Sequence, residues 1–154
     1  MNAQPKVLVI EEDNEERARI CRIIEGSNLF IPIEAVDTFD AFKLLKKARS
    51  GLGFLGYKID CMIMGSSCKS KGFEFLKAFR NEESLNFLYY RMPVIVLTAS
   101  SNKNRNNPSK NSVLAFAAIK LMTPFAKEDL INLLRRLIID QDNEILLDIL
   151  KEKV

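Results

Sequence analysis

The sequence predicts an α/β fold in which a doubly wound, five-stranded parallel sheet is covered by helices on both faces. Two observations support this prediction. Short aliphatic runs, the first at 6–10 (KVLVI), lack the alternation of a half-exposed strand, which indicates strands buried on both faces. Segments with helical spacing of apolar residues separate these runs, as the crossovers of a parallel sheet require.

Strand and helix alternate through the first 50 residues. After the first strand, Asp13 or Asn14 is expected to cap a helix that ends at Gly26. The next strand starts at Phe30 and is expected at a sheet edge, because Pro32 has no N–H for a second neighbour. A helix then starts at Thr38. Its expected inward residues are Ala41, Phe42, Leu45 and Ala48, and its expected outward residues are Lys43, Lys46, Lys47 and Arg49.

The same alternation continues from residue 59 onward. Strands are expected from Ile59, from Met92 and at 119–122, with a polar loop at 65–71 and a helix at 72–81 after the first of these. The inner residues expected for that helix are Phe75, Leu76 and Phe79. An Asn-rich exposed loop at 101–111 precedes the last strand. A final amphipathic helix is marked by Leu130, Leu133, Leu134, Leu137 and Ile138.

The chain divides into a domain at 1–139 and a helical extension at 140–154. A second apolar stripe in the extension consists of Ile145, Leu146, Ile149 and Leu150. Because such a stripe is unfavourable in water, the extension is expected to fold back on the domain, to pair with a second copy, or to begin a linker.

Composition excludes several classes of protein. With 154 residues, 47% of them hydrophobic and 28% charged, the chain is expected to form one domain with a substantial core. A net charge of +3 without a localised stripe does not favour nucleic acid as a partner. The sequence has no long apolar run and no signal-peptide core, so a cytoplasmic location is expected. Histidine is absent, which excludes histidine-based catalysis, metal binding and phosphorelay.

Three consecutive acids, Glu11, Glu12 and Asp13, follow the first strand. In open parallel sheets, ligands bind just beyond the carboxyl ends of the strands. Carboxylates at that position suit a cation and not a phosphate, and this disfavours a flavin-binding or other enzyme on the same fold.

The order of these segments resembles the receiver domain of bacterial two-component response regulators, over roughly 6–139. The matching motifs are VIEED around Ile10, PVIVLTA from Pro93 with the hydroxyl residue Thr98, and the PF dipeptide at Pro124. The resemblance implies a flavodoxin-like, CheY-like fold. It also implies a pocket in which an aspartate after the third strand accepts a phosphoryl group from a kinase. In that family, the acidic pair holds magnesium with this aspartate, the hydroxyl residue contacts the phosphoryl group, and a lysine before PF pairs with its charge.

The sequence departs from the family at two of these positions. If Asp60 is the acid that the family has five residues before its phosphoacceptor, Gly65 stands at the phosphoacceptor position; a shifted alignment gives Met64. Thr123 stands in place of the lysine. The resemblance therefore implies a vestigial pocket of Glu11, Glu12, Gly65, Thr98 and Thr123, which lacks the nucleophile and the counter-charge.

The remaining pocket residues are expected to have simple roles. We expect Glu11 and Glu12 to be solvated acids that bind Mg²⁺ weakly at best, with no other cofactor. Thr98 is expected to be a strand-end threonine with its hydroxyl satisfied. The loop residues Ser66, Ser67 and Cys68 have no evident base beside them, so a simple loop is favoured over a nucleophile.

The interpretation is a pseudo-receiver: a signalling domain that is not an enzyme and acts through protein–protein interaction without aspartate phosphorylation. The alternative is a true phosphoacceptor that uses Asp60 or Asp13. A small-molecule-binding enzyme on a flavodoxin-like fold is a further, less favoured reading, and a DNA-binding regulator would need an output domain beyond these elements. The expected partner is another signalling protein, such as a histidine kinase or an output protein, with a homodimer through the C-terminal helix also open.

The possible output surface also differs from the family pattern. Its candidate residues are Lys103, Arg105 and Lys110 in the Asn-rich loop, and Lys120 where the family often has an aromatic switch residue. This change favours a partner specific to this protein, although a tolerated surface insertion explains it equally well.

Overall fold

A computed structural model of the chain describes residues 3–49, 57–85, 91–99 and 118–141. Its centre is a parallel sheet of five strands in the order β2-β1-β3-β4-β5. The strands are β1 (Lys6–Ile10), β2 (Ile31–Ala35), β3 (Cys61–Met64), β4 (Val94–Ala99) and β5 (Ala118–Thr123). The predicted α/β fold with a five-stranded parallel sheet is confirmed.

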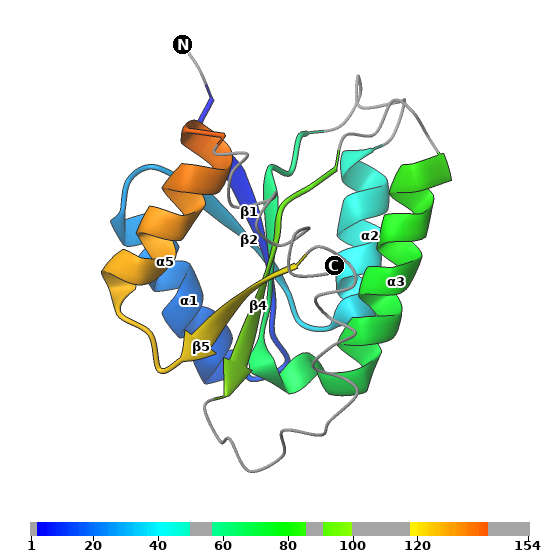
Figure 1. Ribbon diagram of the computed structural model, residues 1–154, viewed down its shortest axis with the longest axis horizontal. Coiled ribbons are helices and arrows are strands. Elements are labelled where there is room, and N and C mark those ends of the chain that lie inside the picture. The colour runs from blue at the N-terminus through cyan, green and yellow to red at the C-terminus, as the bar shows by residue number, and fades with distance from the viewer. Residues whose placement is uncertain (1–2, 50–56, 86–90, 100–117, 142–154) are drawn as a thin grey trace, which may run out of the picture.

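Helices cover both faces of the sheet (Figure 1). The helices are α1 (Asn14–Gly26), α2 (Thr38–Ala48), α3 (Lys69–Leu85) and α5 (Lys127–Leu134). A short 3₁₀ turn, η2 (Ser66–Cys68), leads into α3, and a π-helical turn, η3 (Arg135–Ile139), extends α5. In Figure 1, α1 and α5 lie on the left of the sheet and α2 and α3 on the right.

Two apolar clusters hold the three layers together, one on each face. Alternate residues of a strand point to opposite faces, so Leu8 and Ile10 pack with Leu76 on the side of α2 and α3. Val7 and Val9 join the cluster on the side of α1 and α5. Residues 7–10 of β1 and all of β3 are buried, which agrees with their continuous apolar sequences.

The helix and strand boundaries confirm most of the sequence predictions in the first half. Asp13 is the N-cap of α1, and its Oδ1 accepts a hydrogen bond from the Glu16 N–H at 2.8 Å. Strand β2, with Pro32, lies at the sheet edge, as the missing donor predicted.

Two predictions for α2 were wrong. Phe42 was expected to face inward, but half of its surface is exposed. Arg49 was expected to face outward, but its guanidinium lies 4.7 Å from the centre of the Phe79 ring and 3.9 Å from a carboxylate oxygen of Glu83. Arg49 is the C-cap of α2, and at this end of the helix its guanidinium stacks on a ring of α3 instead of extending into solvent.

The predicted loop at 65–71 was also wrong in part. The chain forms η2 directly after Gly65, and α3 begins at Lys69, three residues before the predicted start. Cys68 of this turn is buried, and its packing holds the turn against the sheet. The Asn-rich segment at 101–111 and the stripe at 145–150 lie outside the described residues.

Candidate functional site at the carboxyl ends of the strands

The candidate site lies where β1 and β3 end side by side. Ile10 pairs with Met64 in the sheet, so the next residues, Glu11 and Gly65, are neighbours. The Gly65 N–H donates a hydrogen bond of 2.7 Å to the carbonyl of Ile10 and continues the ladder by one step. This register places Gly65 at the strand tip, directly beside the acidic residues.

Glu11 is buried at this strand tip, with only 1% of its surface exposed. Its Oε1 accepts hydrogen bonds from the Ser67 hydroxyl and from the Asp13 N–H, the latter at 3.0 Å. Its Oε2 is buried and has no hydrogen-bond partner among the described residues. The expectation of a solvated acid was therefore wrong for Glu11, while Glu12 is exposed as expected.

The absence of a side chain at Gly65 makes room for the Glu11 carboxylate. A Cβ placed on Gly65 would overlap with Glu11 Oε2 and would lie 3.1 Å from Glu11 Cβ. The φ angle of Gly65 lies outside the left-handed region, so backbone conformation does not demand glycine here. The Glu11 carboxylate thus occupies the space into which a side chain at position 65 would extend.

Ser67 holds this arrangement together. Its hydroxyl oxygen accepts a hydrogen bond from the Glu12 N–H at 3.2 Å while its proton is donated to Glu11. Arg17 supports the same turn, because its Nη1 donates to the Glu11 carbonyl at 2.8 Å. The sequence interpretation treated Ser67 as a plain loop residue and did not consider Arg17. Contacts over 56 residues, such as that of Ser67 with Glu11, leave no local signal in a sequence.

The neighbouring thiol of Cys68 is buried. Cys68 Sγ is 3.5 Å from the Ile10 carbonyl, to which it donates a hydrogen bond. Burial, together with the negative charges of Glu11 and Glu12, raises the pKa of the Cys68 thiol to about 12. The thiolate of Cys68 is therefore scarce near neutral pH.

Thr98 and Thr123 lie at the carboxyl ends of β4 and β5. Thr98 pairs with Met122 and Ala99 pairs with Thr123. The Thr123 hydroxyl donates a hydrogen bond of 3.2 Å to the Thr98 carbonyl, so it is turned toward the backbone. A neutral hydroxyl in this position supplies no positive charge to the site.

The other candidate residues do not converge on the site. Asp60 precedes β3, at the amino ends of the strands. There it accepts a 3.0 Å hydrogen bond from the Lys6 N–H and lies 3.5 Å from Lys58 Nζ. Asp60 therefore lies at the end of β3 opposite to Gly65, away from the candidate site. Lys120 lies in β5, three residues before Thr123, and strand alternation puts the two on opposite faces. Lys103, Arg105 and Lys110 lie outside the described residues.

The donor set does not fit a magnesium site. Mg²⁺ needs carboxylate oxygens that point together into an open octahedral site. Here Glu11 is turned into the protein, Glu12 is exposed, and Gly65 offers no ligand. In the described part of the chain there is no group of three acidic, cysteine or histidine residues that could hold a metal ion.

Comparison with known proteins identifies the fold. Neither a protein-family model nor a curated protein matches the sequence. Among solved structures, the chain is similar to the Vibrio cholerae chemotaxis protein CheY4, with 24% identity, a TM-score of 0.63, and coverage of 87% of this chain and 98% of that one. It is also similar to a CheY-like receiver domain protein from Methanospirillum hungatei, with 13% identity, a TM-score of 0.68, and coverage of 92% and 99%.

The chain is also similar in structure to a response regulator from Thermotoga maritima, with 18% identity, a TM-score of 0.65, and coverage of 88% of this chain and 98% of that chain. At these levels of identity, the likeness establishes the fold alone. The chain therefore has the flavodoxin-like fold of CheY-like receiver domains, as the resemblance implied. None of the described helices is both long and apolar enough to cross a membrane.

Proposed function

We propose that this protein is a pseudo-receiver: a signalling domain with the receiver fold that acts through protein–protein contact and without aspartate phosphorylation. The observation that carries the proposal is the Glu11 carboxylate in the side-chain space of Gly65. Phosphoryl transfer to a receiver needs a carboxylate oxygen that is free for in-line attack, with cations that offset the charge on the transferring group. The site offers neither, because Gly65 has no side chain and Thr123 is neutral.

The pocket residues in this proposal have structural roles. The hydrogen bond from Ser67 to Glu11 stabilises the end of β1 beside Gly65. The hydrogen bond from Thr123 to the Thr98 carbonyl joins the ends of β4 and β5. We propose no cofactor and at most weak Mg²⁺ binding at Glu11 and Glu12. The partner is another signalling protein, such as a histidine kinase or an output protein, and neither nucleic acid nor a membrane is a partner. The cytoplasmic location expected from the sequence stays a prediction.

The alternative is a non-standard phosphoacceptor at Asp60 or Asp13, and only Asp13 lies beside the candidate site. Asp13 lies at the carboxyl ends of the strands, beside the candidate site, and is exposed. Its Oδ1 is the acceptor of the α1 N-cap bond, however, and phosphorylation of that carboxylate would place a bulky group on the cap. The pseudo-receiver is therefore the better supported of the two functions.

Intact-mass spectrometry tests the proposal. The full chain is incubated with acetyl phosphate and Mg²⁺, beside an active receiver domain as positive control. We expect no gain in mass for this protein. A gain of one phosphoryl group would overturn the proposal, and its loss in Asp13→Asn would assign it to the alternative site.

A second experiment addresses the mode of signalling. Proteins captured from the native cell extract by the immobilised chain are compared with and without acetyl phosphate. The proposal predicts the same bound proteins in equal amounts, because the site has no acceptor whose state can change. A partner retained only after acetyl phosphate treatment would contradict it.

A further inference from the structure

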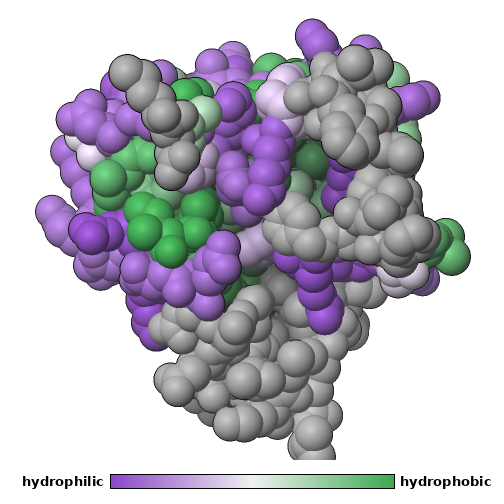
Figure 2. Space-filling model, turned by 90° about the horizontal axis from the view of Figure 1, so that it is seen from above, coloured by the Kyte–Doolittle hydropathy of each residue, from purple (hydrophilic) through white to green (hydrophobic). Residues whose placement is uncertain are grey.

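A groove between α1 and α5 has a volume of about 780 Å³. Its floor is apolar and includes Ile23 of α1, Leu29 and Ile131 of α5. Figure 2 shows hydrophobic surface in green, ringed by hydrophilic residues, on the side of the molecule where α1 and α5 lie. Partly buried apolar side chains in an open groove favour an occupant with an apolar face.

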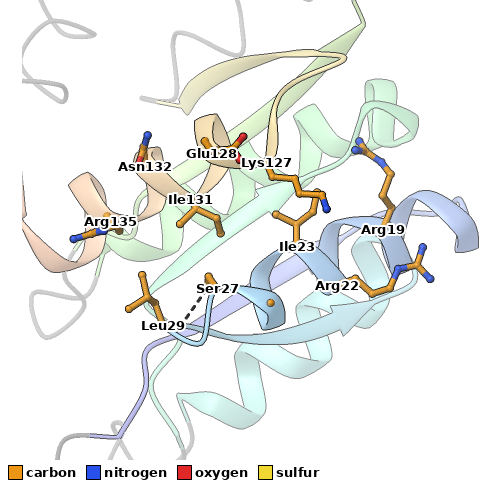
Figure 3. Close-up of a pocket in the computed structure, with 11 residues that line it drawn as sticks. Arg19, Arg22, Ile23, Ser27, Leu29, Lys127, Glu128, Ile131, Asn132 and Arg135 are labelled. Carbon is orange, nitrogen blue, oxygen red and sulfur yellow. Dashed lines mark hydrogen bonds between the residues drawn. The ribbon is translucent and has the colours of Figure 1, made fainter.

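The rim of this groove is positively charged. Arg19, Arg22, Lys127 and Arg135 line it, against one acid, Glu128. Figure 3 shows Ile23 and Ile131 in the middle of the groove, with Arg135 toward one end and Arg19 and Arg22 toward the other. Within the described part of the chain, no ion pair is formed by the exposed side chains of Arg22, Lys127 and Arg135. The groove therefore favours an occupant that is acidic as well as apolar.

The segment at 142–154 of the same chain has this composition. Its apolar stripe consists of Ile145, Leu146, Ile149 and Leu150. Its side chains include four acids, Asp142, Glu144, Asp148 and Glu152, against two bases, Lys151 and Lys153, and the bases stand only at its end. The charge of this stretch is thus opposite to that of the groove rim, and its apolar stripe matches the groove floor.

The last described residues before this segment lie beyond one end of the groove. Helix α5 lines the groove from Lys127, and its π-helical extension continues past the end of the groove marked by Arg135 as far as Ile139. Gln141 has a φ of 48°, a left-handed conformation that ends a helix and turns the chain. From Lys127 to Arg135 the groove is about 12 Å long, and a helix from 142 to 150 has about the same length.

We propose that the segment at 142–154 folds back as an amphipathic helix into the groove between α1 and α5. In that place its acids lie within about one Debye length, ~10 Å, of the rim cations. The segment would thereby cover the apolar floor, and a partner protein that uses this face would have to displace it. The inference goes beyond the proposed function and is independent of the chemistry at Gly65.

A second groove, between α2 and α3, is the competing place for the segment. It has a volume of about 400 Å³ and is lined by Phe42, Phe75 and Phe79. Its charged residues are Lys46, Arg49 and Glu82, and Arg49 already contacts Phe79 and Glu83. This groove offers less positive charge, and α5 does not lead into it, so the groove beside α1 is favoured.

Disulfide trapping in the full chain tests the proposal. The three native thiols are buried, and burial raises the pKa of each to about 12, so they do not compete with introduced cysteines. Asn132→Cys lines the groove on α5, and Leu150→Cys lies in the segment. Under copper–phenanthroline oxidation, we expect this pair to form a disulfide within one chain, seen as a faster band on a non-reducing gel.

The matched control pair is Ala78→Cys with Leu150→Cys, because Ala78 lines the groove between α2 and α3. The proposal is overturned if this control forms the intrachain disulfide more rapidly, or if neither pair does so. A disulfide-linked dimer from the Asn132 pair would also overturn it, since the groove would then hold a second copy. Far-UV circular dichroism of each variant verifies that the domain is folded.

Charge reversal provides a second readout. Arg22→Glu combined with Lys127→Glu should slow the Asn132–Leu150 disulfide by roughly threefold or more at low salt, the effect expected from losing exposed charge pairs. Lys47→Glu on α2 is the matched control, because Lys47 is exposed and away from the groove. Equal trapping rates in both charge variants would show that charge does not guide the segment to the groove, and would contradict that part of the proposal.

Discussion

The overlap between a side chain at position 65 and the Glu11 carboxylate leads to a quantitative prediction. In Gly65→Ala, the new Cβ would force the carboxylate away from Ser67 and from the Asp13 N–H. Each hydrogen bond to a charged group contributes about 1.5 kcal/mol or more, and hydration of the displaced carboxylate offsets part of the loss. We therefore expect Gly65→Ala to lower the free energy of unfolding by about 2 kcal/mol.

The same substitution should cost less when Glu11 is absent. In a Glu11→Ala background the carboxylate is gone, but Cβ of residue 11 remains 3.1 Å from the new methyl group. A residual cost of about 0.5–1 kcal/mol is expected from this tight contact. The double-mutant cycle should therefore give a coupling free energy of about 1–1.5 kcal/mol between positions 11 and 65.

Urea unfolding of the wild type, both single variants and the double variant measures this coupling. The slope of the free energy with urea should be the same in all four proteins, which verifies that they unfold in the same way. Gly26→Ala is the matched control, since a Cβ at Gly26 meets no atom within 4 Å. It should be neutral or stabilising by up to about 1 kcal/mol. A coupling below about 0.5 kcal/mol would refute the idea that Glu11 occupies the space beside Gly65.

Three further predictions follow from the same structure. Isothermal calorimetry should detect no Mg²⁺ binding tighter than about millimolar, and micromolar affinity would show that Glu11 turns outward to bind it. The three buried cysteines, Cys21, Cys61 and Cys68, have pKa values raised to about 12 from the ordinary 9.0, mainly by burial. They should resist a thiol reagent at pH 8 until urea unfolds the chain, and stability should be full below pH 9 and fall as the pH rises toward 12, because only the unfolded thiols ionise in that window. Glu83→Ala should cost about 3 kcal/mol in urea unfolding, since Glu83 is buried and accepts hydrogen bonds from Arg80 Nη1 at 2.6 Å and from the Met92 N–H at 2.7 Å. Glu82→Ala, at an exposed neighbouring position, should change stability by less than about 0.5 kcal/mol, and equal effects of the two substitutions would contradict the buried role of Glu83.

Some features of the site could be predicted from the sequence and others could not. The edge position of β2 followed from Pro32, and the start of α1 followed from Asp13, because both effects act within a few residues. The exposure of Phe42 was missed, since helical spacing alone does not show how far a neighbouring helix extends. Ser67 was missed as a partner of Glu11 because hydrogen bonds between distant segments depend on strand register.

The order of buried strands and amphipathic helices determined the fold, and the resemblance to receiver domains placed Gly65 and Thr123 at the positions of the usual nucleophile and counter-charge. Only the tertiary structure showed what replaces them. Pairing of β1 with β3 brings Glu11 beside Gly65, and the space left by the missing side chain holds the carboxylate in a buried position. Asp60 lies at the opposite end of β3, because the four residues of this strand separate it from Gly65. Local sequence specifies which residues a strand contains, whereas packing between strands decides which of their ends meet.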